Sequence, residues 1–130
     1  MNVYDYAHSL AKAIKASPEY IGFKKCQDKL EEDQSAKEML TDFRKSQLEL
    51  QKQKMSGLEV APEQEQNLAQ RWEIINMNLL IKEYLEAEYR FSVMLTDVQK
   101  IIGEALADIL SLQVPDPFSE QEENRDEEQP

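Results

Sequence analysis

Few residues in this sequence could do covalent chemistry. It has one histidine, His8, and one cysteine, Cys26. Nucleophilic catalysis needs a nucleophile beside a base, and His8 falls on the polar side of the first expected helix, near Asp5 and Lys12. Cys26 shares an apolar helix face with Phe23, which is typical of a small core residue. Lysines nearby in the sequence keep a reactive thiolate open as the alternative.

Metal and phosphate sites are also poorly represented. A structural zinc site wants four Cys or His ligands, and a di-iron bundle wants two Glu-x-x-His pairs, so the supply of these residues is too small for either. Glu86 and Glu88 point to different sides of a helix, and the glycines at 22, 57 and 103 form no phosphate-binding loop. We therefore expect no catalytic residue, no metal site, no cofactor and no enzyme activity.

Glu88 is nevertheless unusual, because it interrupts an apolar seam. Two series with a seven-residue spacing run through the C-terminal part of the chain, and nine of their ten positions are apolar. The ten positions are Ile81, Tyr84, Glu88, Phe91, Leu95, Val98, Ile102, Ala105, Ile109 and Leu112. A carboxylate buried without a partner is costly, so we expect Glu88 to be paired, solvated or protonated.

Four roles for Glu88 compete. Gln47 is a second polar residue on an apolar face, between Phe43 and Leu50. If the helices that carry Gln47 and Glu88 pack antiparallel, the two side chains could meet and fix the helix register. We rank this structural role first, a solvated position at the rim second, a contact with a partner third and catalysis last.

The elements that position these residues are predicted to be helices only. Composition favours helix over sheet, with 41% hydrophobic and 32% charged residues. We expect about five helices, built as a bundle on a long helical hairpin. Asn2 and Ser17 are expected N-caps, Asp33 and Ser35 compete for a third, and Gly57 ends the third helix. After Pro62 a fourth helix should break near residues 76–78, and the last should run from about Leu79 to Leu112, roughly 50 Å.

The last helix carries more apolar surface than one small domain can cover. Leu80, Leu85, Met94, Ile101 and Leu106 flank the seam, so neighbours on more than one side are expected. A second copy of the chain is the obvious one. Gly103 is expected at a close helix crossing, or less readily in a groove for a foreign helix. The resulting interface and specificity candidates are Gln47, Tyr84, Glu88, Phe91, Leu95, Val98 and Gly103.

Charge divides the chain into a domain and a tail. The net charge of the 130 residues is −11, and residues 114–130 hold seven acids and one base. We expect a helical domain over residues 1–113 and an acidic, disordered tail over 114–130. An acidic body disfavours direct binding of nucleic acid or anionic lipid. The sequence shows no signal peptide and no apolar run of spanning length, so a cytoplasmic protein is expected.

An ordered set of short segments resembles the YlbF/YmcA group of small bacterial helical proteins, and most closely its uncharacterised YheA-like branch. The segments are Ser17-Pro18-Glu19-Tyr20, Phe43 with Gln47, Asn78 with Ile81, Tyr84-Leu85-Glu86-Ala87-Glu88, and Ile102-Gly103. The resemblance covers about residues 1–113 and leaves the acidic tail outside.

The resemblance implies an all-α fold on a long helical hairpin that associates as a dimer or higher oligomer. It also implies a non-enzymatic role, because related members act in complexes that influence competence, sporulation and biofilm formation, partly through an mRNA-cleaving endoribonuclease. Some relatives carry iron–sulfur clusters on a cysteine-bearing extension. The tail of this chain has no cysteine, so that cofactor is not expected. Leu79 follows Asn78 where relatives often have proline.

Three functional hypotheses follow. The first is a helical adaptor that self-associates and docks on a protein partner, with a regulatory role in competence, sporulation or RNA-processing complexes by resemblance. The second is a regulatory binder that holds a peptide or small ligand in an apolar helical groove near Gly103. The third is an enzyme that uses Glu88 or Cys26. We favour the first hypothesis and keep the second as its alternative.

Overall fold

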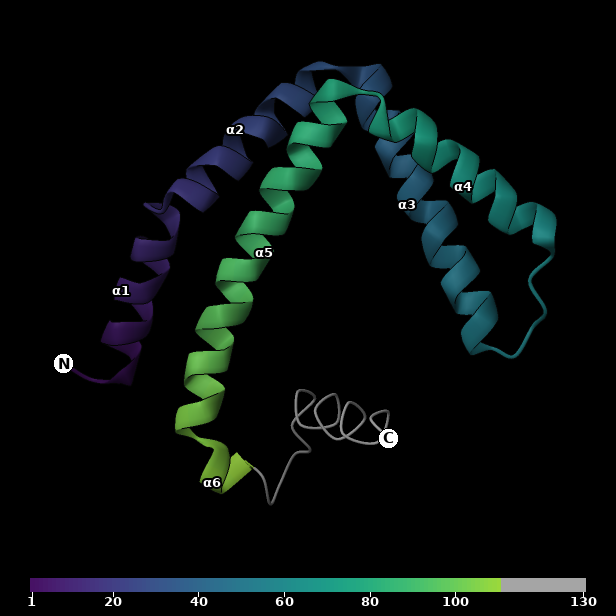
Figure 1. The fold of residues 1–130 in the computed structure, drawn as a ribbon. Helices are drawn as coiled ribbons and strands as arrows, with labels where there is room; N and C mark the ends of the chain where they lie inside the picture. The colour runs from purple at the N-terminus through teal and green to yellow at the C-terminus, as the bar shows by residue number, and fades with distance from the viewer. Residues whose placement is uncertain (111–130) are drawn as a thin grey trace, which may run out of the picture. The chain divides into compact units, whose positions relative to one another are not determined.

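A computed structural model describes residues 1–110 of the chain and shows helices without any strand over that range. The helices are α1 (Val3–Lys15), α2 (Pro18–Glu32), α3 (Gln34–Met55), α4 (Pro62–Asn76), α5 (Leu79–Ala105) and α6 (Ala107–Leu110) (Figure 1). The expected all-α class is confirmed, and α6 is a short addition to the five long helices. The expected tail over residues 114–130 lies outside the described residues.

Helix starts follow the capping residues of the sequence. Asn2 Oδ1 accepts a hydrogen bond from the Asp5 N–H at 3.0 Å, and Asp5 Oδ2 accepts one from the Asn2 N–H at 3.2 Å. Ser17 Oγ accepts from the N–H of Tyr20 at the start of α2, where Pro18 occupies the first turn. Each bond satisfies an amide that the helix leaves unpaired, so sequence and structure agree here.

Two later starts complete this pattern. Of the two N-cap candidates for α3, Asp33 is the one that caps the helix. Its carboxylate accepts a hydrogen bond from the Ala36 N–H at 3.1 Å. The expected break before the last helix is present, since α4 ends at Asn76 and α5 begins at Leu79. The Asn78 side chain, expected to compete for backbone groups, accepts from the Ile81 N–H at 3.2 Å and so begins α5.

Gly57 reverses the chain between α3 and α4. It has a φ of 76°, in the left-handed region that glycine adopts at little cost. The Leu58 N–H donates to the Gln53 carbonyl at 3.0 Å, and the Gly57 N–H donates to the Lys54 carbonyl at 3.3 Å. These two bonds form a Schellman motif, which ends α3 and allows α4 to return alongside it (Figure 1).

The last long helix is shorter than expected. It ends at Ala105 instead of continuing to Leu112, and a turn at Leu106 separates it from α6. The Leu106 N–H donates to the Gly103 carbonyl at 3.2 Å, which is the tighter spacing of a 3₁₀ turn. Glycine weakens a helix by about 1 kcal/mol relative to alanine, so Gly103 is a natural place for this change. Residues 111 and 112 lie beyond the described range.

The chain divides into two units, Met1–Phe91 and the part from Ser92 onward, and α5 passes from the first into the second. The buried core lies in the first unit and is small. It consists of Leu30, Ala36, Leu40, Phe43, Ile75 and Ile81. These side chains come from α2, α3, α4 and the first turn of α5, so the core ties four helices together. Among the helices over residues 1–110, none is long and apolar enough to cross a bilayer.

Candidate interaction surfaces

Four of the seven candidate residues, Gln47, Tyr84, Glu88 and Phe91, lie on α3 and the first part of α5. Arg44 Nη2 donates to both carboxylate oxygens of Glu88, at 2.6 and 2.8 Å. The same guanidinium lies 5.7 Å from the ring centroid of Tyr84, over its face. The hydrogen bond to Glu88 is the main cause that raises the pKa of Arg44. Burial raises the pKa of the Tyr84 hydroxyl, and the Glu88 charge adds to this shift. Glu88 is thus paired and half-buried.

The partner of Glu88 is Arg44, whereas sequence reasoning named Gln47. Gln47 lies one turn farther along α3 and is exposed. Helices α3 and α5 run in the same general direction in the first unit, because α4, which separates them in the sequence, runs back alongside α3 before α5 begins (Figure 1). The antiparallel arrangement considered from the sequence is therefore wrong. Arg44 follows the buried Leu40 by four residues and therefore lies on the same face of α3. This spacing was the feature of the sequence that could have identified Arg44 as the partner of Glu88.

We expect the Arg44–Glu88 pair to contribute modestly to stability. Exposed pairs contribute about 0.2–1 kcal/mol, and two hydrogen bonds to one carboxylate favour the upper part of that range. A double-mutant cycle of Arg44→Gln and Glu88→Gln, measured by urea unfolding, should give a coupling energy of about 0.5–1 kcal/mol that falls with salt.

The matched control is the Lys24–Asp28 pair on α2, which joins the two side chains at 3.2 Å with both more exposed. Its cycle should give a smaller coupling, about 0.3 kcal/mol. Equal coupling in both pairs would contradict the importance given to the two-oxygen contact.

An aromatic cluster joins α2 to α5 within the first unit. Phe23 lies 5.2 Å from Tyr84 and 5.5 Å from Phe91 between ring centroids, and Tyr20 lies 6.1 Å from Phe91. All three contacts are tilted, as aromatic pairs prefer. Tyr84 and Phe91, both predicted as interface candidates, are half-buried inside the single chain. Part of the apolar seam is therefore used by the fold itself.

An apolar groove, lined by residues of α3, α4 and the start of α5, has a volume of about 540 Å³. Its apolar lining includes Leu40, Phe43, Leu50, Leu68, Trp72 and Leu85. Phe43 and Trp72 pack at 5.5 Å between centroids, and Trp72 remains 43% exposed. Gln47 and the Arg44–Glu88 pair lie along the same groove. This groove brings Gln47 and Glu88 to one surface without a hydrogen bond between them.

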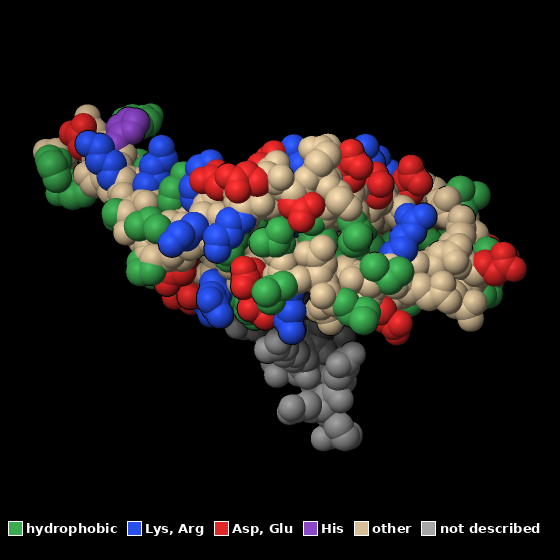
Figure 2. Space-filling model, turned by 90° about the horizontal axis from the view of Figure 1, so that it is seen from above, with side chains coloured by type: hydrophobic (Ala, Val, Ile, Leu, Met, Phe, Trp, Pro, Cys, Tyr) green, Lys and Arg blue, Asp and Glu red, His purple; other side chains and the backbone are tan. Residues whose placement is uncertain are grey.

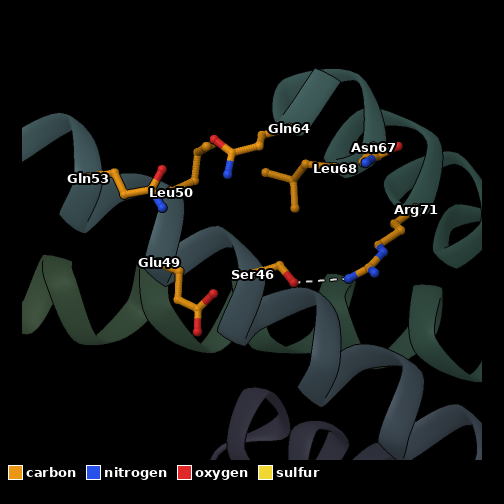
Figure 3. A pocket seen from close by; sticks show the side chains of 8 residues that line it. All are labelled: Ser46, Glu49, Leu50, Gln53, Gln64, Asn67, Leu68 and Arg71. Atoms are coloured by element: carbon orange, nitrogen blue, oxygen red, sulfur yellow. Dashed lines mark hydrogen bonds between the residues drawn. The ribbon is translucent and has the colours of Figure 1, made fainter. Parts of the chain in front are cut away.

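A second, polar cleft opens between α3 and α4, toward the loop that joins them (Figure 3). We call it the amide cleft, because Gln53, Gln64 and Asn67 line it. Its volume is about 180 Å³. Arg71 Nη1 donates to Ser46 Oγ at 2.9 Å and closes one end of the cleft. This cleft could not be recognised from the sequence, since nothing in the spacing of single amides on two helices shows that they face each other.

The apolar face of the helix continues beyond the first unit. Leu95 and Val98 are half-buried, whereas Ile101, Ile102 and Ile109 are 67%, 48% and 61% exposed. Gly103 is half-buried, and no heavy atom beyond its own stretch of helix lies within 4 Å of the position a Cβ would take. The close crossing expected at Gly103 is therefore not formed by the described residues of one chain.

The residues considered for catalysis are not brought together. His8 is exposed on α1, and Cys26 is half-buried on α2. Within residues 1–110 no three His, Cys, Asp or Glu side chains gather in a way that could hold a metal ion. On the face shown in Figure 2, exposed hydrophobic side chains lie among acidic and basic ones. The distinctive surfaces of the described residues are therefore the apolar groove, the amide cleft and the apolar face of α5.

The family of the chain follows from its match to known sequences. The model of the family described as "Control of competence regulator ComK, YlbF/YmcA" matches residues 3–107. The chain belongs to the YlbF/YmcA family. The matched range contains all five long helices and ends at the first residue of α6. The acidic segment from residue 114 lies outside the match, as the resemblance had suggested.

The chain is also similar to curated proteins and to a solved structure. A UPF0342 protein of Alkalihalophilus pseudofirmus is 44% identical over 108 residues, which cover 83% of this chain and 92% of the relative. A UPF0342 protein of Halothermothrix orenii is 42% identical over 102 residues, covering 78% and 86%. A solved protein of unknown function (DUF964) from Bacillus stearothermophilus matches with a TM-score of 0.71 and 22% identity, covering 86% of this chain and 97% of that chain. That likeness concerns the fold, and none of these names is that of an enzyme.

Proposed function

We propose that this member of the YlbF/YmcA family is a non-enzymatic regulatory adaptor that self-associates through α5 and docks on a protein partner. The observation that carries the proposal is the set of exposed apolar side chains from Val93 to Leu110, on α5, on α6 and in the turn between them. The exposed residues are Val93, Ile101, Ile102, Leu106, Ile109 and Leu110. Large exposed apolar patches mark interaction sites, so this concentration of exposed apolar side chains favours such a site here.

A second copy of the chain is the proposed cover for this surface. The apolar positions of α5 include the seam and both of its flanks, which is wider than the stripe of a two-stranded coiled coil. The charged residues Asp97, Lys100 and Glu104 lie outside these positions. An interface without charges at its edges suits burial against several helices at once, as in a bundle built from two copies.

The regulatory part of the proposal rests on the family, whose name links it to control of a competence regulator. We propose that it acts on protein partners, because a net charge of −11 disfavours contact with nucleic acid or anionic lipid. We also propose that it acts in the cytoplasm. Tyr84, Phe91, Leu95, Val98 and Gly103 remain our interface candidates. Glu88 remains a specificity candidate, held in place by Arg44.

Replacing Ile102 by glutamate tests self-association. Ile102 is 48% exposed, so a carboxylate there should leave the fold of one chain intact. In an assembled interface it would be buried without a partner, and the dissociation constant should rise at least about 100-fold. Sedimentation velocity over a range of concentrations measures the change. Phe91 is less suitable for substitution because it also packs against Tyr20 and Phe23.

The control is Thr96→Glu, which adds the same charge to the same helix outside its apolar positions. This variant should sediment like the wild-type protein. A wild-type chain that stays monomeric and folded at high concentration would overturn the proposal, as would equal effects of the two variants.

The apolar groove supports the alternative function of a regulatory peptide or ligand binder. Its exposed Trp72 and its apolar walls are features of sites that accept an amphipathic helix. The groove lies along α3, α4 and the start of α5, away from Gly103 in the sequence. An assembly that leaves Trp72 accessible to a fluorescence quencher would keep this alternative open.

A further inference from the structure

The amide cleft is distinct from the apolar surfaces used so far. Gln53 extends from α3, and Gln64 and Asn67 extend from α4 (Figure 3). In the part of the chain that the structure describes, no hydrogen bond engages the side-chain amide of any of the three. Each therefore offers both a carbonyl acceptor and an NH₂ donor to a molecule in the cleft. A peptide group carries the same pair of functions, one donor and one acceptor.

Arg71 supplies a charge at one end of the cleft. Its only described partner is the neutral hydroxyl of Ser46, and over residues 1–110 no carboxylate pairs with it. Glu49 also lines the cleft, but among the described residues it forms no ion pair with Arg71 (Figure 3). A guanidinium has five N–H donors, so the bond to Ser46 fixes Arg71 while leaving donors for an incoming carboxylate.

The other end of the cleft carries the opposite charge. A neighbouring hollow of about 470 Å³ shares Gln53, Gln64 and Asn67 with the amide cleft and extends to the loop before α4. Glu59 and Glu63 line this part, and neither takes part in an ion pair among the described residues. The three amides are thus shared by two hollows, one of which reaches the cation at Arg71 and the other the two carboxylates.

The distance between Arg71 and Glu63 determines which peptide conformation fits the cleft. Glu63 and Arg71 are eight residues apart on α4, about 12 Å at 1.5 Å per residue. An extended peptide rises about 3.3 Å per residue, so four residues cover this distance. A segment with an acidic and a basic side chain four positions apart would meet both Arg71 and Glu63 while its main chain faces the amides.

We propose that the amide cleft binds an extended segment of a partner protein through its main chain, with an acidic side chain at Arg71 and a basic one near Glu63. The inference deepens the docking role in the proposed function and rests on it for its biological meaning. It assigns that docking to the α3–α4 hairpin, which leaves the apolar face of α5 free for self-association.

Two pentapeptide probes test the site in both chain directions: acetyl-Asp-Thr-Val-Thr-Lys-amide and acetyl-Lys-Thr-Val-Thr-Asp-amide. Their β-branched residues favour the extended form. Nuclear magnetic resonance of the ¹⁵N-labelled full chain reads the side-chain NH₂ signals of Gln53 and Gln64 directly. We expect one probe to shift these signals saturably, with a dissociation constant on the order of 1 mM, as for a short, exposed contact.

Variants assign the contacts. Arg71→Gln and Glu63→Gln should each weaken binding about tenfold, the effect of losing one charge-assisted hydrogen bond. Glu63→Gln leaves the Ser46–Arg71 bond untouched, so it separates ligand binding from any disturbance of the cleft.

Two control variants and a modified probe complete the test. Arg90→Gln and Gln51→Ala change exposed residues outside the cleft and should bind as the wild-type chain does. A probe that is N-methylated at valine should lose most of its affinity.

Three outcomes would overturn the inference. They are the absence of a saturable shift for both probes, unchanged affinity in both charge variants, or equal binding of the N-methylated probe. Sedimentation of the same samples reports self-association separately. Peptide binding by a monomeric chain would support the cleft and contradict the proposed assembly. A chain that assembles but does not bind the peptides would support the assembly and contradict the cleft.

Discussion

The Ile75→Ala variant should lose about 2–5 kcal/mol of unfolding free energy, the range found when a large aliphatic core residue is reduced to alanine. Ile75 is 1% exposed and lies in a core of six side chains that joins four helices. So small a core has few other contacts with which to compensate for the cavity. Since single domains are stable by about 5–15 kcal/mol, this one change should remove a large part of the total. Urea unfolding followed by circular dichroism measures the loss.

The neighbouring residue provides a matched control. Ile74 has the same side chain on the same helix but is 56% exposed. Ile74→Ala should cost under about 0.5 kcal/mol, as expected for surface substitutions. Similar losses in the two variants would mean that α4 does not present Ile75 to the core as described.

Phe23→Ala is expected to have the second largest effect, a loss of about 3 kcal/mol. Phe23 is half-buried and contacts both Tyr84 and Phe91. Its removal would lose the transfer free energy of an aromatic ring together with two favourable ring contacts. Because these contacts hold α2 against α5, the loss should also reduce the cooperativity of unfolding.

A double-mutant cycle identifies the ring contact itself. Phe23→Ala combined with Phe91→Ala should show a coupling of about 0.5–1.5 kcal/mol, the range measured for aromatic pairs. Tyr4→Ala, at an exposed aromatic residue of α1, serves as the control and should change stability little. Additive effects at positions 23 and 91 would show that the two rings do not touch in solution.

The residues that act locally made the helices predictable from sequence. Asn2, Ser17 and Gly57 each make their hydrogen bonds within a few residues, so their roles could be recognised from their neighbours alone. The end of α5 was misplaced because the apolar repeat continues past Gly103 without interruption. The conformation changes there through the backbone, which a side-chain pattern does not report.

Contacts between helices were harder to predict. Glu88 was recognised as a residue that needs a partner, yet Arg44 depends on the direction of α3 relative to α5. That direction follows from the intervening α4 and not from either helix alone. The amide cleft is less predictable still, since Gln53 and Gln64 are ordinary polar helix residues until the hairpin places them opposite each other.

Helix α1 has 13 residues, a fully developed capping box and no buried side chain. Isolated helices of fewer than about 12–15 residues are only marginally stable in water. The stability of α1 must therefore depend on its caps, on α2 and on any partner that covers its apolar side in an assembly. Amide hydrogen exchange in α1 should consequently be much faster than in α3, which supplies three of the buried core residues. An assembly that covers α1 would slow this exchange, so α1 would report assembly through its own rate of opening.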